Sequence, residues 1–163
     1  MSEEGTSALS GRVPAVKPKN AVRFDRTLGP FFYKFHRWMY EASDGRFGAT
    51  SPQGPMLLLS TVGRRSGQPR TTPLMYMRDG ENFVVVGSNG GRPRPPAWFL
   101  NLEAEPKATV RVGRRRLGVV AELAGPEEKA ELWPRLHEFY EGWAYYQTLT
   151  DRELPVVSLR PQL

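Results

Sequence analysis

The spacing of hydrophobic residues divides the chain into three parts. Residues 1–20 are rich in Ser, Pro, Gly and Lys and offer little apolar surface to bury, which predicts a flexible tail. Over residues 21–43, apolar side chains recur at steps of three and four, which predicts an amphipathic helix with Pro30 in its first turn or at a kink. Residues 44–163 are expected to form one β-rich domain. The helical stripe consists of Phe24, Leu28, Phe31, Phe32, Phe35, Trp38 and Met39.

From residue 56 onward, short apolar runs alternate with turn signals, as in strands. Met56–Val62 and Arg70–Arg78 are joined by a basic turn, and the Asp79-Gly80 turn leads into Phe83–Val86, so three consecutive antiparallel strands are expected. The whole pattern predicts a mainly β fold of the α+β class, a six-stranded antiparallel barrel with short helices inserted. The later elements are expected as a helix at 97–103, a hairpin of 109–112 and 117–123, a helix at 127–140, a helical or turn-like segment at 140–149, and a strand at 154–159.

Composition narrows the chemistry that is open to the chain. It contains no cysteine, which excludes disulfides, thiolate nucleophiles and iron–sulfur clusters, and only two histidines, too few for a His-based zinc triad; no metal is expected. The formal net charge is +6, and 18 of the 23 basic residues are arginine, which favours an acidic ligand or surface. We see neither a secretory signal nor an apolar run of the ~20 residues that span a bilayer, so a cytoplasmic location is expected.

The apolar stripe at 22–42 has two interpretations that can both hold. The helix can pack on the core of the domain. It can also rest on an anionic membrane surface, because its aromatic face is large and its charged residues are basic. Peripheral contact with the inner face of the cell membrane is therefore an open expectation. The basic residues of this segment are Arg23, Arg26, Lys34 and Arg37.

The turn at 63–70 concentrates positive charge beside flexible backbone. Arg64, Arg65 and Arg70 can offer planar forks to phosphate or carboxylate oxygens, and the neighbouring glycines let backbone amides approach a ligand closely. The same pattern also fits a solvated hairpin turn. A second glycine-rich loop, Ser88–Gly91, follows the next-but-one strand and is expected at the same end of a meander, where both loops would form one positive, amide-lined pocket. On its own, this loop could be a plain connection.

The aromatic cluster near the C-terminus is the third candidate feature. Tyr140, Trp143, Tyr145 and Tyr146 can be packing residues, or they can stack on a planar ring and form a substrate wall. The sequence contains neither a Ser-His-Asp set nor a phosphate-binding P-loop. An enzyme without such side-chain signatures often takes its reactivity from a cofactor.

Between about Met56 and Val157, a series of motifs occurs in the order found in a known protein family. The chain resembles the deazaflavin (F420)-dependent nitroreductase family of mycobacteria and related actinobacteria. The motifs that carry the resemblance are Thr61–Arg70, Thr72-Pro73-Leu74, Ser88–Gly91, Pro96–Leu102, Glu105-Pro106, Trp133-Pro134, Tyr140, Tyr146-Gln147, Thr150-Asp151-Arg152 and Leu154-Pro155.

The resemblance implies a split β-barrel of the flavin-reductase, FMN-binding kind that binds coenzyme F420, with FMN as the runner-up. It also implies an oxidoreductase that transfers a hydride between reduced deazaflavin and a small organic acceptor of the quinone, enone or nitroaromatic type. A monomer or homodimer is expected, without nucleic acid. The first alternative is a non-catalytic carrier of F420 or flavin, and the second is a basic nucleic-acid or lipid binder.

The resemblance also implies roles for individual residues. Departures from the family pattern make the acceptor the least transferable part: Met75 and Trp143 stand where tyrosines occur, and Asn89 where lysine is common, a charge that Arg92 or Arg94 could replace. The implied cofactor tail site is Arg64, Arg65, Ser66 and Arg70; the ring site is Thr71, Thr72, Pro73, Leu74, Met75, Val86, Gly87, Ser88 and Asn89, with Ala97, Trp98 and Asn101 along the groove; the substrate wall is Met75, Tyr140, Trp143 and Tyr146; and the candidate proton or hydrogen-bond donors are Ser88, Tyr76 and Tyr146.

Overall fold

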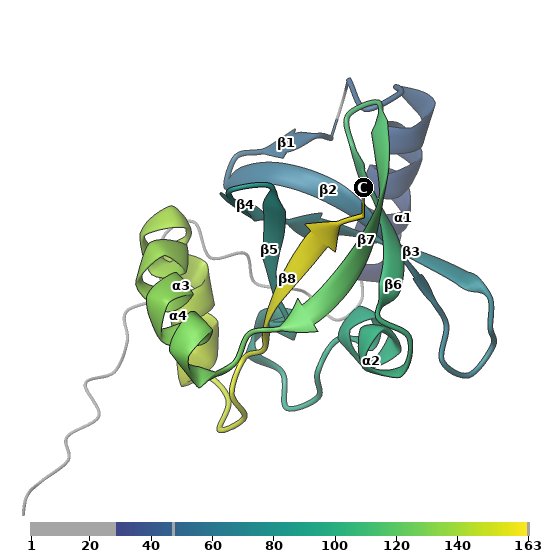
Figure 1. Cartoon of the computed structure of the whole chain (residues 1–163). Helices are drawn as coiled ribbons and strands as arrows, with labels where there is room; N and C mark the ends of the chain where they lie inside the picture. The colour runs from purple at the N-terminus through teal and green to yellow at the C-terminus, as the bar shows by residue number, and fades with distance from the viewer. Residues whose placement is uncertain (1–28, 47, 163) are drawn as a thin grey trace, which may run out of the picture.

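The computed structural model describes residues 29–46 and 48–162. The predicted tail and the predicted helical residues 21–28 lie outside this part of the chain. The elements, shown in Figure 1, are α1 (Gly29–Ala42), β1 (Thr50–Ser51), β2 (Gly54–Val62), β3 (Pro69–Met75), β4 (Met77–Asp79), β5 (Asn82–Val86), the 3-10 turn η1 (Asn89–Gly91), α2 (Ala97–Ala104), β6 (Lys107–Val112), β7 (Arg115–Leu123), α3 (Pro126–Phe139), α4 (Glu141–Thr148) and β8 (Val156–Pro161).

The strands form one curled antiparallel sheet in the order β1-β2-β6-β7-β8-β5-β4, and β3 pairs with β2. The predicted mainly antiparallel split barrel with short helices is confirmed. The predicted number of six strands is wrong, because the described residues contain eight. One of the two additional strands is the two-residue β1, and the other arises from the division of the expected strand at 70–78 into β3 and β4.

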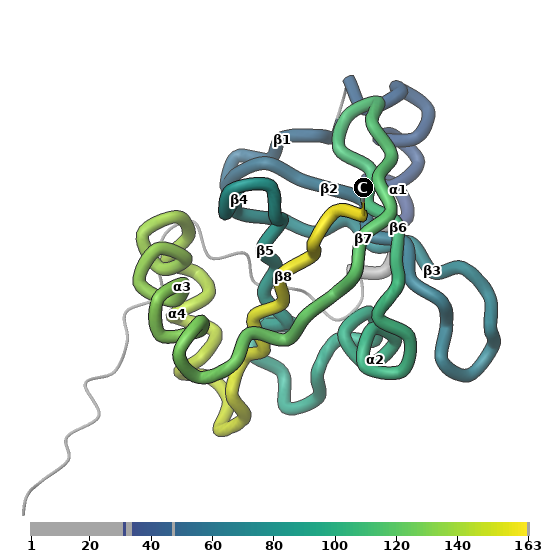
Figure 2. The backbone as a smooth tube through the Cα atoms, viewed as in Figure 1, coloured from purple at the N-terminus to yellow at the C-terminus, as the bar shows by residue number. Residues whose placement is uncertain are grey.

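The division falls at Tyr76, where the chain leaves one strand partner for another. The amide of Tyr76 still donates to the carbonyl of Pro55 in β2 at 3.2 Å, whereas Met77 already pairs with Val84 in β5. The expected three-strand meander is therefore two separate hairpins, β2–β3 and β4–β5. Figure 2 shows the β2–β3 hairpin extending away from the rest of the sheet.

Successive side chains of each strand point to opposite faces of the sheet, and the apolar ones form one cluster on each face. On β5, Phe83 and Val85 point into the barrel core, while Val84 and Val86 belong to a second cluster with α3 and α4. Figure 1 shows these two helices together at one end of the sheet, beside β5 and β8. The second cluster therefore fixes α4, which carries the aromatic residues around Trp143, against the strand that leads to Ser88.

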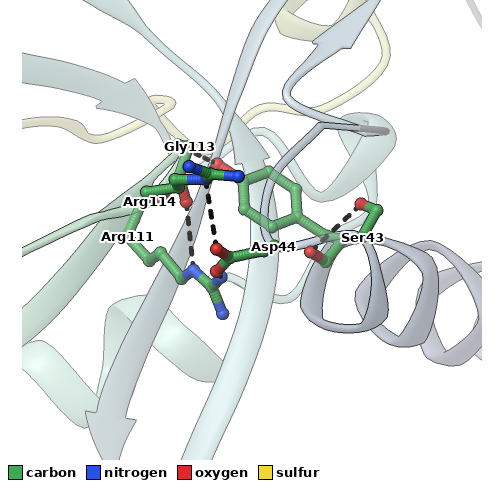
Figure 3. A network of polar contacts seen from close by, with 6 residues as sticks. Ser43, Asp44, Arg111, Gly113 and Arg114 are labelled. Atoms are coloured by element: carbon green, nitrogen blue, oxygen red, sulfur yellow. Dashed lines mark hydrogen bonds and ion pairs between the residues drawn. The ribbon is translucent and has the colours of Figure 1, made fainter.

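Helix α1 is fixed to the barrel near its C-terminal end. The fully buried Tyr40 accepts a hydrogen bond from the amide of Gly113 at 2.6 Å. Asp44 then pairs with Arg111 of β6 at 2.6 Å and with Arg114 of the β6–β7 turn at 3.1 Å, so this hairpin holds the end of the helix (Figure 3). One face of α1 is thus packed on the domain, as the first interpretation of the apolar stripe predicts.

Candidate functional site

A first cavity of about 480 Å³ opens beside the turn between β2 and β3. Positive charge dominates its lining. The side chains of Arg64, Arg65 and Arg70 are exposed, and in the part of the chain that the structure describes none of them pairs with a carboxylate. The lining residues are Lys34, Arg37, Gly63, Arg64, Arg65, Ser66, Pro69, Arg70, Thr71, Thr72, Ala97, Trp98 and Asn101.

The turn at 63–70, called the basic turn below, is held in shape by its own backbone. Gly63 donates to the carbonyl of Gln68 at 2.8 Å, and Gly67 donates to the carbonyl of Gly63 at 2.7 Å. The hydroxyl of Ser66 accepts a hydrogen bond from Arg70 at 3.4 Å. A Cβ atom at Gly63 would lie 2.6 Å from this hydroxyl and 3.1 Å from the carbonyl oxygen of Gln68, so a larger residue would displace the Ser66 side chain from this position.

Asn101 of α2 connects the basic turn to the barrel. Only 4% of the residue is exposed. Its amide nitrogen donates to the hydroxyl of Thr61 at 3.1 Å, and its Oδ1 accepts from the backbone amide of Arg64 at 3.1 Å and from the guanidinium at 3.4 Å. Asn101 was predicted to lie along the cofactor groove. It lines the first cavity, and it also orients one of the arginines there.

Helix α1 supplies two further cations to the first cavity. Lys34 and Arg37 line it together with the sequence-predicted residues, and Arg37 also pairs with Glu41 at 3.0 Å. The sequence interpretation assigned these cations to the basic side of the apolar stripe and to membrane contact, and not to a cofactor site. The missed signal was their spacing of three residues, which places both on one side of a helix.

A second cavity of about 380 Å³ lies between β3, the end of β5 and α4, and its lining is mainly apolar and aromatic. The rings of Tyr140 and Trp143 meet edge to face at 5.5 Å, and the hydroxyls of Tyr140 and Tyr146 are 3.5 Å apart. The lining residues are His36, Ser51, Pro52, Gln53, Met56, Pro73, Leu74, Met75, Val86, Ser88, Tyr140, Trp143 and Tyr146.

The two cavities are neighbours along β3. Thr71 and Thr72 line the first cavity, and the next three residues, 73–75, line the second. Helix α1 borders both, with Lys34 on the first cavity and His36 on the second. A ligand with a charged end and a flat apolar end could therefore lie along one strand.

The loop of residues 87–92, called the Ser88 loop below, does not share the pocket of the basic turn. Ser88 lines the second cavity, so the predicted single pocket is wrong; the bend at Tyr76 separates the two loops. Asn89 has a φ of 47° and donates from Nδ2 to the carbonyl of Arg94 at 2.9 Å, while the amide of Gly87 donates to Pro155 at 2.8 Å. These contacts fix the loop beside the cavity.

The predicted site residues fall into three groups. Ser66, Ala97 and Trp98, predicted for the tail and the groove, line the first cavity, and so do Thr71 and Thr72, which were predicted for the ring. Tyr76, Gly87 and Asn89 line neither of the two cavities. The ring of Tyr76 packs in the barrel core against Phe83 at 5.4 Å. The residues that line the second cavity are Pro73, Leu74, Met75, Val86, Ser88, Tyr140, Trp143 and Tyr146.

His36 is a titratable group at the second cavity that the sequence did not single out. Burial lowers its pKa from the ordinary value of 6.5, and a hydrogen bond to the backbone of Gly48 acts in the opposite direction. The imidazole therefore favours its neutral form at neutral pH. Within residues 29–46 and 48–162, no three His, Cys, Asp or Glu side chains are grouped so that they could hold a metal ion.

Comparisons of the chain with known protein families, curated proteins and solved structures identify its relatives. A model of the F420H(2)-dependent quinone reductase family matches residues 32–161. An F420H(2)-dependent quinone reductase of Mycobacterium tuberculosis is 40% identical over 139 residues, which cover 83% of this chain and 93% of the relative. The solved structure of an F420-H2 dependent reductase, FDR-A, is 36% identical, with a TM-score of 0.60 over 65% of this chain and 94% of that one.

A further similar structure, described as a domain-swapped dimer, is 32% identical with a TM-score of 0.63, and the match covers 78% of this chain and 94% of that one. The family model covers most of the chain, and the curated relative is matched over most of its own length. The predicted resemblance to F420-dependent reductases is thereby confirmed. The chain belongs to the F420H(2)-dependent quinone reductase family.

Proposed function

We propose that this protein binds reduced F420 across its two cavities and uses it to reduce a quinone-type acceptor. The observation that carries the proposal is the joint arrangement of the cavities: one strand, β3, leads from a cationic cavity to an aromatic one. F420 has the same division, because a polyanionic phosphate and oligoglutamate tail is attached to a planar deazaflavin ring. The naming of relatives as quinone reductases supports the acceptor class.

The first cavity has the donors that a polyanionic tail requires. Arg64, Arg65 and Arg70 can each present a planar fork to phosphate or carboxylate oxygens, and Lys34 and Arg37 face them from α1. We assign the tail to this cavity.

The ring is proposed to lie along residues 71–75 and to reach Val86 and Ser88. In the described part of the chain, β3 pairs with β2 alone, so its second edge offers backbone groups to the polar rim of a planar ring. Met75 and Trp143 supply apolar surface at the far end of this path. Such a cavity holds a ring largely by its shape and backbone.

When bound, F420H2 supplies a hydride from C5 of its ring. The protein must hold the acceptor in contact with that position, and the aromatic wall of Tyr140, Trp143 and Tyr146 excludes water from it. A quinone that gains a hydride also takes a proton onto oxygen. The hydroxyls of Ser88 and Tyr146 line the cavity and can donate a hydrogen bond to that oxygen. Tyr76, in the barrel core, takes no part in this proposal.

Oxidation of F420H2 in the presence of menadione tests the proposed function. We expect turnover that follows the loss of reduced cofactor and the formation of the hydroquinone. The Ser88→Ala variant should bind the cofactor and turn over more slowly. Tight F420 binding without turnover, on a panel of quinones, enones and nitroaromatics, would instead identify a carrier.

We also propose that α1 makes peripheral contact with an anionic membrane surface, where lipid-soluble quinones reside. Phe31, Phe35 and Trp38 are 78%, 58% and 63% exposed, and the last two rings lie 6.0 Å apart. Aromatic side chains beside Lys34 and Arg37 fit the boundary between lipid headgroups and acyl chains. No helix in the described residues is both long and apolar enough to span a bilayer, so the contact would be with the surface.

A further inference from the structure

Arg152 lies between α4 and β8, and its guanidinium binds one loop through three backbone carbonyls. It donates to Gly87 at 3.1 Å, to Ser88 at 2.8 Å and to Arg92 at 2.9 Å. All three acceptors belong to the Ser88 loop. Among the described residues, Arg152 forms no ion pair with a carboxylate. The positive charge of its guanidinium strengthens the three hydrogen bonds to the carbonyls.

The backbone around Arg152 is fixed in turn to α4. Gln147, in the last turn of that helix, donates from Nε2 to the carbonyl of Arg152 at 2.8 Å. Its Oε1 accepts from the amide of Leu154 at 2.9 Å. A continuous polar connection therefore runs from α4 through Gln147 and Arg152 to Ser88.

This connection joins the two walls of the second cavity. Trp143 and Tyr146 line the cavity from α4, and Ser88 lines it from the other side. Direct contact limits how closely the walls approach: a Cβ atom at Gly91 would lie 2.8 Å from the carbonyl oxygen of Tyr146. The loop thus rests against α4 at Gly91 and is drawn toward it by Arg152.

We propose that Arg152 is a positioning residue for the reduction: together with Gln147 it sets the distance between Ser88 and the aromatic wall. The inference rests on the proposed function, because the second cavity must hold the ring and the acceptor in contact. A displacement of about 1 Å can lower the rate of such a reaction on the order of 100-fold. Arg152 acts through Ser88 and does not itself line the cavity.

The test is single-turnover oxidation of F420H2 bound to the full-length protein, with menadione as acceptor. For Arg152→Gln we expect the rate constant to fall on the order of 10- to 100-fold, while the amplitude and the Kd for F420 stay near the wild-type values. Guanidinium ion added to Arg152→Ala should restore part of the rate. Arg160→Gln, which removes an exposed arginine paired with Glu122, is the matched control and should be unchanged.

The amplitude distinguishes positioning from a merely structural role. A lower amplitude at an unchanged rate constant would overturn the inference, because it would mean that fewer molecules fold while each reacts normally. An unchanged rate and amplitude would overturn it as well. In a double-mutant cycle with Gln147→Ala, we expect the combined loss to be smaller than the product of the separate losses.

A second readout separates this inference from the proposed function. Amide hydrogen exchange of residues 88–92 in the protein without cofactor should speed up in Arg152→Gln and remain unchanged in Arg160→Gln. If the wild-type protein binds F420 but oxidises no F420H2, the proposed function fails. In that case, unaltered exchange would also show that Arg152 does not hold the loop.

Discussion

At the scale of single residues, buried polar groups shape both cavities. Asn101 is almost fully buried; it donates a hydrogen bond to the hydroxyl of Thr61 and accepts one from the backbone amide of Arg64. Removing one partner of a buried hydrogen bond leaves the other unsatisfied at a cost of about 1–3 kcal/mol. Asn101 therefore links the stability of the fold to the geometry of the basic turn.

Substitution of Asn101 by Ala should weaken F420 binding as well as the fold. Arg64 would lose the two hydrogen bonds that orient it, so we expect the Kd for F420 to rise by about tenfold and the free energy of unfolding to fall by about 1–3 kcal/mol. Fluorescence titration and urea unfolding measure these quantities. Asn82→Ala, at the start of β5, is the control. An unchanged Kd would show that Asn101 does not orient the arginine.

His36 should make the stability depend on pH. Its folded-state pKa is lowered by burial, so the unfolded chain takes up the proton more readily. The stabilisation is complete above the ordinary pKa of 6.5 and is lost as the pH falls toward and below the folded-state value. Urea unfolding at about pH 7.5 and pH 5 should show a smaller pH-dependent loss in His36→Gln than in the wild type. Equal losses would contradict this reading.

At the scale of elements, α1 presents three different faces. With 3.6 residues per turn, His36 and Tyr40 share the face packed on the barrel, Lys34 and Arg37 share the face at the first cavity, and the exposed aromatics share the third. One helix thus combines packing on the barrel, the proposed contact with the cofactor and the proposed membrane surface.

The aromatic face can be removed without disturbing the core. The triple substitution Phe31→Ser, Phe35→Ser and Trp38→Ser should leave Tm nearly unchanged, because these side chains are exposed. Flotation with phosphatidylglycerol vesicles should show binding by the wild type and at least about tenfold weaker binding by the variant. Leu123→Ser, which removes another exposed apolar residue, is the control. Equal binding by all three proteins would refute the proposed membrane contact.

The sequence allowed most hairpins to be predicted, because local turn chemistry defines them. Asp79-Gly80 does join two strands, and the helix expected at 97–103 is α2. The bend at Tyr76 was hidden, because Leu74 and Tyr76 both contact the barrel core and the period-two pattern continues through the change of partner. Curling of the sheet is a tertiary effect that the local pattern does not reveal.

The site was predicted in its parts and not in its assembly. Arginines beside glycines indicated an anion site because their chemistry is local. The contribution of Lys34 and Arg37 depends on how α1 docks, and the position of Ser88 depends on the strand order. Both follow from contacts between residues far apart in the sequence. The hydrogen bonds from Arg152 to the carbonyls of Ser88 and Arg92 likewise join residues that are 64 and 60 positions apart.

At the scale of the whole molecule, the cationic residues and the aromatic residues of the site line two different cavities. The first cavity gathers five cations from the basic turn and α1, and the second gathers aromatic residues from α4. Strand β3 and helix α1 extend along both. This division leads us to expect a cofactor whose anionic tail is as important for binding as its ring.

The central claim is tested most directly by titrating the purified protein with F420 and, in parallel, with FMN. We predict binding of F420 at micromolar concentrations or below, preferred over FMN, and weakened on the order of 100-fold in the double variant Arg64→Ala/Arg70→Ala. The control, Arg115→Ala/Arg116→Ala, removes the same charge from the β6–β7 hairpin and should bind like the wild type. Preference for FMN, or an Arg64/Arg70 variant that binds F420 undiminished, would contradict the account.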